Sequence, residues 1–184
     1  DRLEIVEAHK ERYEHRAARA EILLILNNYP AQGEEYRRAM LELGYVLRDM
    51  EEPAKAHEAY LNLLNSFPDS EEAGSAKVEI AGLYMFHYPT RDLAKAQSLI
   101  DEVQSEYAGT TPAIHADLGE AAINIMNGNT TQARAILEPH RTDETIPVHM
   151  RFWAQSTYAW SYESDDNLTA AMAAREEAIS NTSY

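Results

Sequence analysis

Two eight-residue stretches of this chain follow the same pattern: LLILNNYP at residues 23–30 and LNLLNSFP at residues 61–68. Each has the apolar residues of a helix end, then an aromatic residue and a proline that stops the helix. A third copy, residues 99–107, ends in Tyr107 at the position of Tyr29 and Phe67, and alanine follows in place of proline. The sequence therefore contains an internal repeat.

A small residue near the start of each of these helices marks the period of the repeat. Alanines recur at intervals of about 37 to 40 residues, namely Ala18, Ala56, Ala96, Ala133 and Ala171. After Ala56, apolar residues follow at steps of three, four, seven, eight and eleven, which is the spacing of one helix face. Another apolar segment precedes each helix, and no segment alternates strictly between apolar and polar residues. The sequence therefore predicts an all-α fold of stacked helical hairpins.

Composition excludes several classes of function. The chain of 184 residues has 16 basic and 31 acidic residues, a formal net charge of −15, and no cysteine. This charge disfavours binding to nucleic acid or to an anionic membrane, so no nucleic-acid partner is predicted. Without cysteine there is no disulfide and no thiolate metal site. The longest apolar run, residues 22–26, is far shorter than the ~20 residues of a membrane helix, so no membrane insertion of this segment is predicted.

At the repeated positions the chain resembles the tetratricopeptide repeat (TPR) family. The copy that matches best is Leu43-Gly44, Ala56, Tyr60 and Pro68, whose spacing from Gly44 onwards is that of the family pattern. The period of about 37 to 40 residues is longer than that of the family, about 34, which implies longer turns. The resemblance implies a right-handed superhelical array of antiparallel helical hairpins, a TPR-like α-solenoid whose first helices line a concave face.

The repeat divides the chain into five segments. A long N-terminal helix, a cap or half a repeat, is expected over residues 1–30, because residues 1–28 contain neither glycine nor proline. A dimer-forming or membrane-proximal stalk is the alternative for this helix. TPR-like repeats are expected over residues 34–68, 70–108, 112–140 and 147–180, and the second of them carries an insertion around residues 86–91.

No set of catalytic groups converges in the sequence. It lacks a glycine-rich phosphate loop, the zinc-binding His-Glu-x-x-His pattern and the Gly-x-Ser-x-Gly elbow. The seven histidines are scattered over different hairpins, and pairs of acids lie at expected helix starts and turns, where negative charge favours the helix dipole. The prediction is a protein that is not an enzyme, with no catalytic residue, no cofactor and no metal.

The resemblance also assigns side chains to the concave face. With Gly44 at the family's first-helix glycine, the candidates for a partner groove are Arg38, Tyr45, Arg48, Met85, Tyr88, His115, Trp153 and Trp160. Tyrosine, tryptophan, methionine and arginine are the residues that anchor protein interfaces. An aromatic, weakly charged groove suits an extended or helical peptide. The alternative is that the large side chains of this set pack as core between hairpins.

These features predict a protein–protein interaction scaffold that binds a peptide or protein partner on its concave face. The sequence Phe-Pro-Asp-Ser at residues 67–70 is also similar to hairpin ends in TPR domains of bacterial envelope proteins. That likeness implies a periplasmic or membrane-anchored soluble domain that helps to assemble an envelope complex. Two alternatives stay open: a scaffold that self-associates as a homo-oligomer through the N-terminal helix or the last hairpin, and an acidic regulatory or recruiting domain of a larger enzyme.

Overall fold

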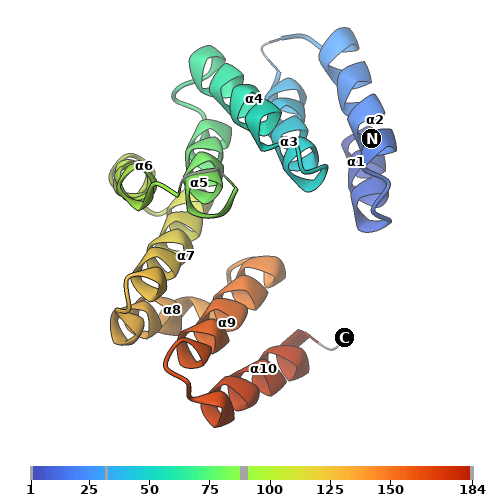
Figure 1. The fold of residues 1–184 in the computed structure, drawn as a ribbon. Coiled ribbons are helices and arrows are strands. Elements are labelled where there is room, and N and C mark those ends of the chain that lie inside the picture. The colour runs from blue at the N-terminus through green and yellow to red at the C-terminus, as the bar shows by residue number, and fades with distance from the viewer. Residues whose placement is uncertain (1, 32, 88–90, 183–184) are drawn as a thin grey trace. The chain divides into compact units, whose positions relative to one another are not determined.

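The computed structural model describes residues 2–31, 33–87 and 91–182. These residues form ten α-helices and no strand (Figure 1): α1 Arg2–Glu11, α2 His15–Asn28, α3 Glu34–Asp49, α4 Pro53–Ser66, α5 Glu71–Phe86, α6 Leu93–Glu106, α7 Thr111–Met126, α8 Thr130–Thr142, α9 Val148–Glu163 and α10 Leu168–Thr182. The all-α prediction is confirmed. The chain forms two compact units, residues 1–99 and 100–184, and the boundary falls within α6.

Four pairs of helices are joined by the same turn. Two or three residues after the end of each first helix, one residue has a left-handed backbone: Tyr13, Glu51, Gly128 and Asp166, with φ of 58°, 60°, 81° and 57°. In the second of these turns, the Glu51 amide donates to the carbonyl of Arg48, and the Glu52 amide donates to the carbonyl of Leu47, both at 2.9 Å. This is the Schellman motif, which satisfies the last carbonyls of a helix. Because the turns at 13 and 51, and those at 128 and 166, are separated by the interval of the sequence repeat, the backbone repeats with the sequence.

The single helix predicted for residues 1–30 is wrong. The chain turns at Tyr13, so α1 and α2 form a hairpin of their own, and Leu3 and Val6 of α1 pack with Ile22 and Ile25 of α2. The prediction failed because it took the absence of glycine as evidence against a turn. In this turn a tyrosine adopts the left-handed conformation that glycine usually supplies.

Small residues allow the helices of a hairpin to approach closely. In unit 1, a Cβ built on Gly44 of α3 would lie 2.0 Å from Cε1 of Tyr60 on α4. Tyr60 is completely buried, in a cluster with Leu41, Leu47, Ala56, Ala59, Leu63, Ala76, Ile80 and Leu83. In unit 2, a small residue instead allows close approach between α6 and α7, which belong to consecutive hairpins: a Cβ on Gly119 of α7 would lie 2.8 Å from Cδ1 of Ile100 on α6. The separate core of this unit consists of Leu118, Ala121, Ile125, Ala133, Leu137 and Ala154.

Ion pairs join each hairpin to the next one within a unit. In unit 1, Arg37 of α3 lies 3.2 Å from Glu72 of α5. In unit 2, Arg134 of α8 lies 2.8 Å from Asp165, and Arg141 of α8 lies 2.7 Å from Glu177 of α10. The partners in these pairs are 31 to 36 residues apart in the sequence. Consecutive hairpins therefore stack through charged groups at their edges as well as through the apolar core.

Candidate partner-binding surfaces

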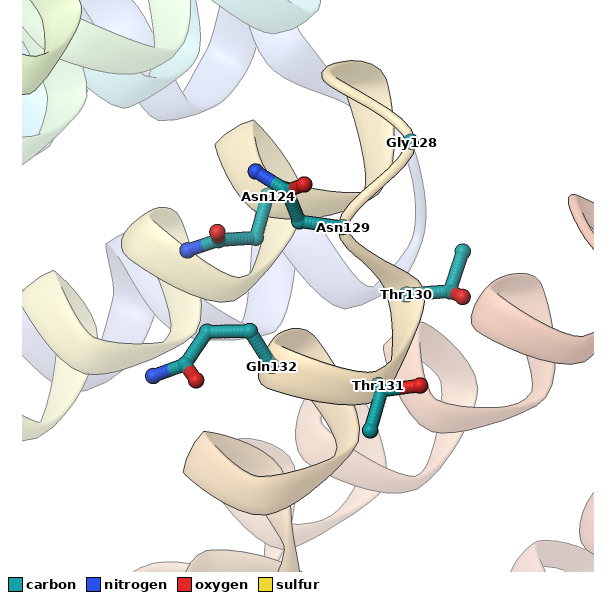
Figure 2. Close-up of a pocket in the computed structure, with 6 residues that line it drawn as sticks. All are labelled: Asn124, Gly128, Asn129, Thr130, Thr131 and Gln132. Carbon is teal, nitrogen blue, oxygen red and sulfur yellow. The ribbon is translucent and has the colours of Figure 1, made fainter.

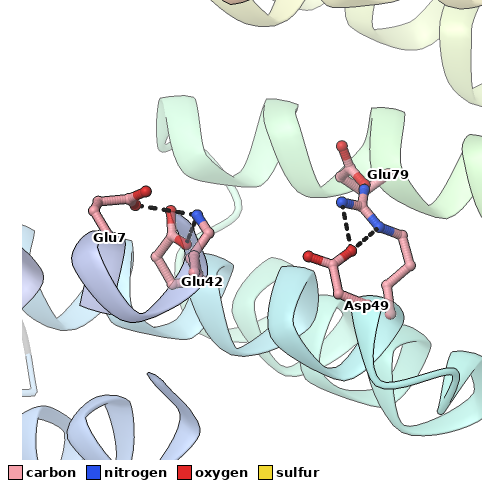
Figure 3. A network of polar contacts seen from close by, with 6 residues as sticks. Glu7, Glu42, Asp49 and Glu79 are labelled. Atoms are coloured by element: carbon pink, nitrogen blue, oxygen red, sulfur yellow. Dashed lines mark hydrogen bonds and ion pairs between the residues drawn. The ribbon is translucent and has the colours of Figure 1, made fainter. Parts of the chain in front are cut away.

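The first helices of the hairpins in unit 1 are α1, α3 and α5, and they carry a ladder of ion pairs (Figure 3). Lys10 Nζ of α1 donates to Glu42 Oε2 of α3 at 2.6 Å and to Glu7 Oε1 at 3.1 Å. Burial lowers the pKa of Lys10, but the two carboxylates, Glu42 first, outweigh it and raise the pKa above its usual value. The ammonium is therefore charged at neutral pH and is held by α1 and α3 together.

The second part of the ladder joins α3 to α5. Arg48 pairs with the Glu79 carboxylate and also lies 3.1 Å from Oδ1 of Asp49 (Figure 3). The side chain of Glu79 is only 14% exposed, and burial raises its pKa against the opposing effect of Arg48. The charges of this surface are thus already paired with one another, and they hold consecutive hairpins together.

Tyr45, one of the predicted groove residues, lies between the two cations of the ladder. Lys10 Nζ and Arg48 Cζ are each 5.4 Å from the centre of its ring, and the rings of Tyr45 and Tyr60 meet in an edge-to-face contact with 6.2 Å between centroids. Burial raises the pKa of Tyr45, so its hydroxyl is neutral. Cations over a ring face are stabilising, which fixes Tyr45 and Arg48 in place. Arg38, on the same helix, is exposed.

Unit 2 has a different surface on its first helices, α7 and α9. The start of α9 exposes three large apolar side chains, Val148 at 45%, Phe152 at 46% and Trp153 at 37%. His149, also exposed, lies one turn before Trp153. Residues four apart lie on one side of a helix, so these four side chains form a continuous patch, the α9 aromatic surface. Its edge is His115 of α7, whose ring centroid is 5.7 Å from that of Trp153.

The histidine at the edge of the α9 aromatic surface, His115, is uncharged at neutral pH. Burial, helped by His149, lowers the pKa of His115 to about 4. A positive charge on His115 is unfavourable beside His149, whose ring centroid lies 6.3 Å away. A ligand of this surface meets aromatic and aliphatic side chains and no paired ions, in contrast to the ladder of unit 1.

The structure separates the predicted groove residues into several groups. Tyr45 and Arg48 contact each other in unit 1, and His115 and Trp153 contact each other in unit 2. Met85 is only 5% exposed, so its assignment to a groove is wrong and it belongs to the core. Trp160 is half-buried and packs against the core of unit 2. Tyr88 lies outside the described residues.

Sequence reasoning missed residues that now define both surfaces. It did not identify Lys10, Glu42 and Glu79 because their partners lie one repeat away. It also missed His149 and Phe152. The spacing of four between Val148 and Phe152, and between His149 and Trp153, was a signal for an apolar patch at the start of α9.

A polar pocket of about 570 Å³ lies at the turn between α7 and α8 (Figure 2), lined by Asn124, Gly128, Asn129, Thr130, Thr131 and Gln132. These side chains offer amides and hydroxyls but no carboxylate, imidazole or amine that could serve as an acid or base. In the described part of the chain, no group of three or more His, Cys, Asp or Glu side chains is placed to hold a metal ion. None of the helices described there has the length and apolar character needed to cross a membrane.

Two solved structures are similar to this chain over nearly its whole length. Both are crystal structures of the nearly identical TPR-like repeats of a kinesin light chain-like protein from Podosopora anserina, one of them a single-residue variant. The TM-scores are 0.62 and 0.60 at 14% identity, over 98% of this chain and 92% of the others. The fold is TPR-like. Neither a family model nor a curated protein matches the sequence. The α-solenoid class predicted from the sequence is confirmed.

Proposed function

We propose that this protein is an interaction scaffold that captures a protein partner through the α9 aromatic surface. The observation that carries the proposal is Trp153, a large aromatic residue exposed beside Phe152 and Val148 on the first helix of a hairpin. Single exposed apolar residues are normal on protein surfaces, whereas a continuous patch marks an interaction site. Tryptophan is also among the residues that contribute most to binding free energy.

The chemistry of the surface indicates the kind of partner. Because His115 is neutral at pH 7, it offers no positive charge to an acidic group, and the overall charge of −15 repels acidic chains. A peptide segment with aromatic or aliphatic anchors, flanked by neutral or basic residues, fits these conditions. The proposed mechanism is the presentation of a preformed surface, with no covalent step.

Arg38, Tyr45 and Arg48 enter the proposal as a secondary contact region in unit 1. Arg38 is exposed and is available to a carboxylate or a carbonyl of the partner. Tyr45 and Arg48 are held in the ladder, and a partner that recruits them must offset the contacts they already make. We therefore expect substitutions at the α9 aromatic surface to affect binding more than substitution of Arg38.

The test is selection of peptides from a random library displayed on phage. Wild-type protein should enrich sequences with aromatic or aliphatic anchors, and the double variant Phe152→Ser/Trp153→Ser should not. Leu61→Ser, at a 40% exposed leucine of α4, is the matched control and should enrich the same peptides as wild type. Equal enrichment by the double variant, with its helical circular dichroism intact, would contradict the proposal.

The proposal also includes a partner in a bacterial envelope assembly. Its support is the sequence likeness at residues 67–70 alone. Capture of the partner from the native host, followed by mass spectrometry, tests it, and a partner that is not an envelope protein would refute this part while leaving the α9 aromatic surface as the binding site.

A further inference from the structure

The last helix, α10, has an exposed apolar side. Leu168, Met172 and Ile179 are 65%, 63% and 64% exposed, respectively. Their spacing of four and then seven residues places them along one side of the helix. The core side of α10 is occupied by other residues, Ala171, Ala174 and Ala178, which are buried. The exposed side is therefore distinct from the packing of α10 onto α9.

The repeat shows what this side of a second helix does in the other hairpins. Counting from the left-handed turn residue, the sixth residue is His57 in α4, Arg134 in α8 and Met172 in α10. His57 packs against the ring of Tyr84 on α5 at 6.1 Å, and Arg134 Cζ lies 4.6 Å from the ring centre of Tyr162 on α9. In both cases the contact is with the first helix of the next hairpin. Met172 thus occupies a position used for stacking hairpins.

A second position supports the same assignment. The thirteenth residue after the turn is Arg141 in α8 and Ile179 in α10. Arg141 packs over the ring of Tyr158 at 4.7 Å and lies 2.7 Å from Glu177, so it contacts both helices of the next hairpin. Ile179 has apolar atoms where Arg141 has a charge, so its exposed side chain suits apolar neighbours and not a tyrosine and a glutamate.

The first hairpin carries those apolar partners. Tyr158 lies eight residues before its turn residue and Glu177 lies eleven residues after it. At the same distances from Tyr13, the first hairpin has Ile5 and Leu24, which are 44% and 41% exposed. In the fifth hairpin these two positions contact Arg141. In the first hairpin the same two positions hold exposed apolar side chains.

We propose that the exposed side of α10 binds the first hairpin of a second copy of this chain, in the register that stacks α8 on α9 and α10. In this arrangement Ile179 packs against Ile5 and Leu24 of the second copy. Burial of these side chains away from water is the driving force. The contact joins two different surfaces, so each copy keeps one free end and the assembly grows as an open chain.

Sedimentation velocity of the full chain over a wide range of concentration tests this. The average mass of the wild type should rise continuously with concentration and should not stop at a dimer. Met172→Glu at one end, or Leu24→Glu at the other, should each weaken association about tenfold or more, because a charge is buried without a partner. Leu61→Glu on α4 is the matched control, and it should associate like the wild type.

Mixing the two blocked variants separates this proposal from other arrangements. Leu24→Glu keeps a normal α10 and Met172→Glu keeps a normal first hairpin, so the mixture should form one-to-one dimers that grow no further. Symmetric pairing of α10 with α10 predicts instead that Leu24→Glu self-associates as well as the wild type. Self-association of Leu24→Glu at the wild-type level would overturn the proposal. A wild type that stays monomeric at every concentration would also overturn it, and so would a Leu61→Glu control whose association is weakened as much as that of the blocked variants.

Discussion

Replacing Gly44 by alanine should destabilise unit 1, because the added methyl group has no space. The new Cβ would lie 2.0 Å from Cε1 of Tyr60 and 2.5 Å from both Cδ1 and Cζ. Carbon atoms that are not bonded prefer separations of about 3.5–4.0 Å. Tyr60 is completely buried, and its ring is in edge-to-face contact with that of Tyr45, so it cannot move aside into solvent. Helices α3 and α4 must separate instead.

Two opposing effects set the size of the loss. Overpacking of a close-packed core costs ~1–3 kcal/mol, and the severity of this contact places Gly44→Ala near the upper end. Alanine is better than glycine in a helix by about 1 kcal/mol. The free energy of unfolding should therefore fall by about 2 kcal/mol, which corresponds to a drop of about 4–8 °C in Tm for a chain of this size.

Urea denaturation followed by circular dichroism measures the effect, and Gly82→Ala is its matched control. Gly82 lies in the first helix of the next hairpin, one repeat later, and a Cβ there meets nothing within 4 Å. This control should gain up to about 1 kcal/mol. Adding Tyr60→Leu to Gly44→Ala should recover part of the loss, because leucine lacks the Cε1 and Cζ atoms that the new methyl group would meet. A Gly44→Ala protein as stable as the wild type would refute the close approach of α3 and α4.

Three further predictions concern single residues. Tyr13→Gly should raise the free energy of unfolding by about 1 kcal/mol, because glycine takes the left-handed conformation without steric cost; an unchanged urea midpoint would argue against this turn. Arg48→Met should lower it by about 3 kcal/mol in the same assay, because the Glu79 carboxylate is left buried without its cation; a loss below about 1 kcal/mol would show that the carboxylate reaches water. The pKa of His115 falls from 6.5 to about 4 on folding, so the unfolded state binds the proton first and stability falls as the pH drops from 6.5 towards 4. The free energy of unfolding should therefore be lower at pH 5 than at pH 7 by about 2 kcal/mol because of this group, and His115→Phe should remove this pH dependence.

Much of the fold was predictable because it depends on local, repeated contacts. The alanines at each second helix follow from the period of the sequence alone, and the structure adds the close contact between Gly44 and Tyr60. The same period also contained the missed turn, since Glu51 lies one repeat after Tyr13. The prediction relied on glycine and proline as turn signals, and this turn uses neither.

The surfaces were less predictable, because their residues depend on the rotation of each helix against its neighbours. Met85 and Trp153 were assigned to the same face, yet one is core and the other is exposed. Successive residues on a helix differ by about 100° in direction, so a small rotation moves a side chain from core to solvent. No pattern within a single repeat sets that rotation.

By itself the sequence determined the period, the helical class and the hairpin as the building block, since each arises from the spacing of small and apolar residues within one repeat. The tertiary structure alone decided the hairpin at the N-terminus, the ladder from Lys10 to Glu79 and the aromatic surface at Trp153. The physical reason, for the ladder and the aromatic surface, is that these features depend on contacts between hairpins. Such contacts join residues more than 30 positions apart, and they form only when stacking has brought the repeats together.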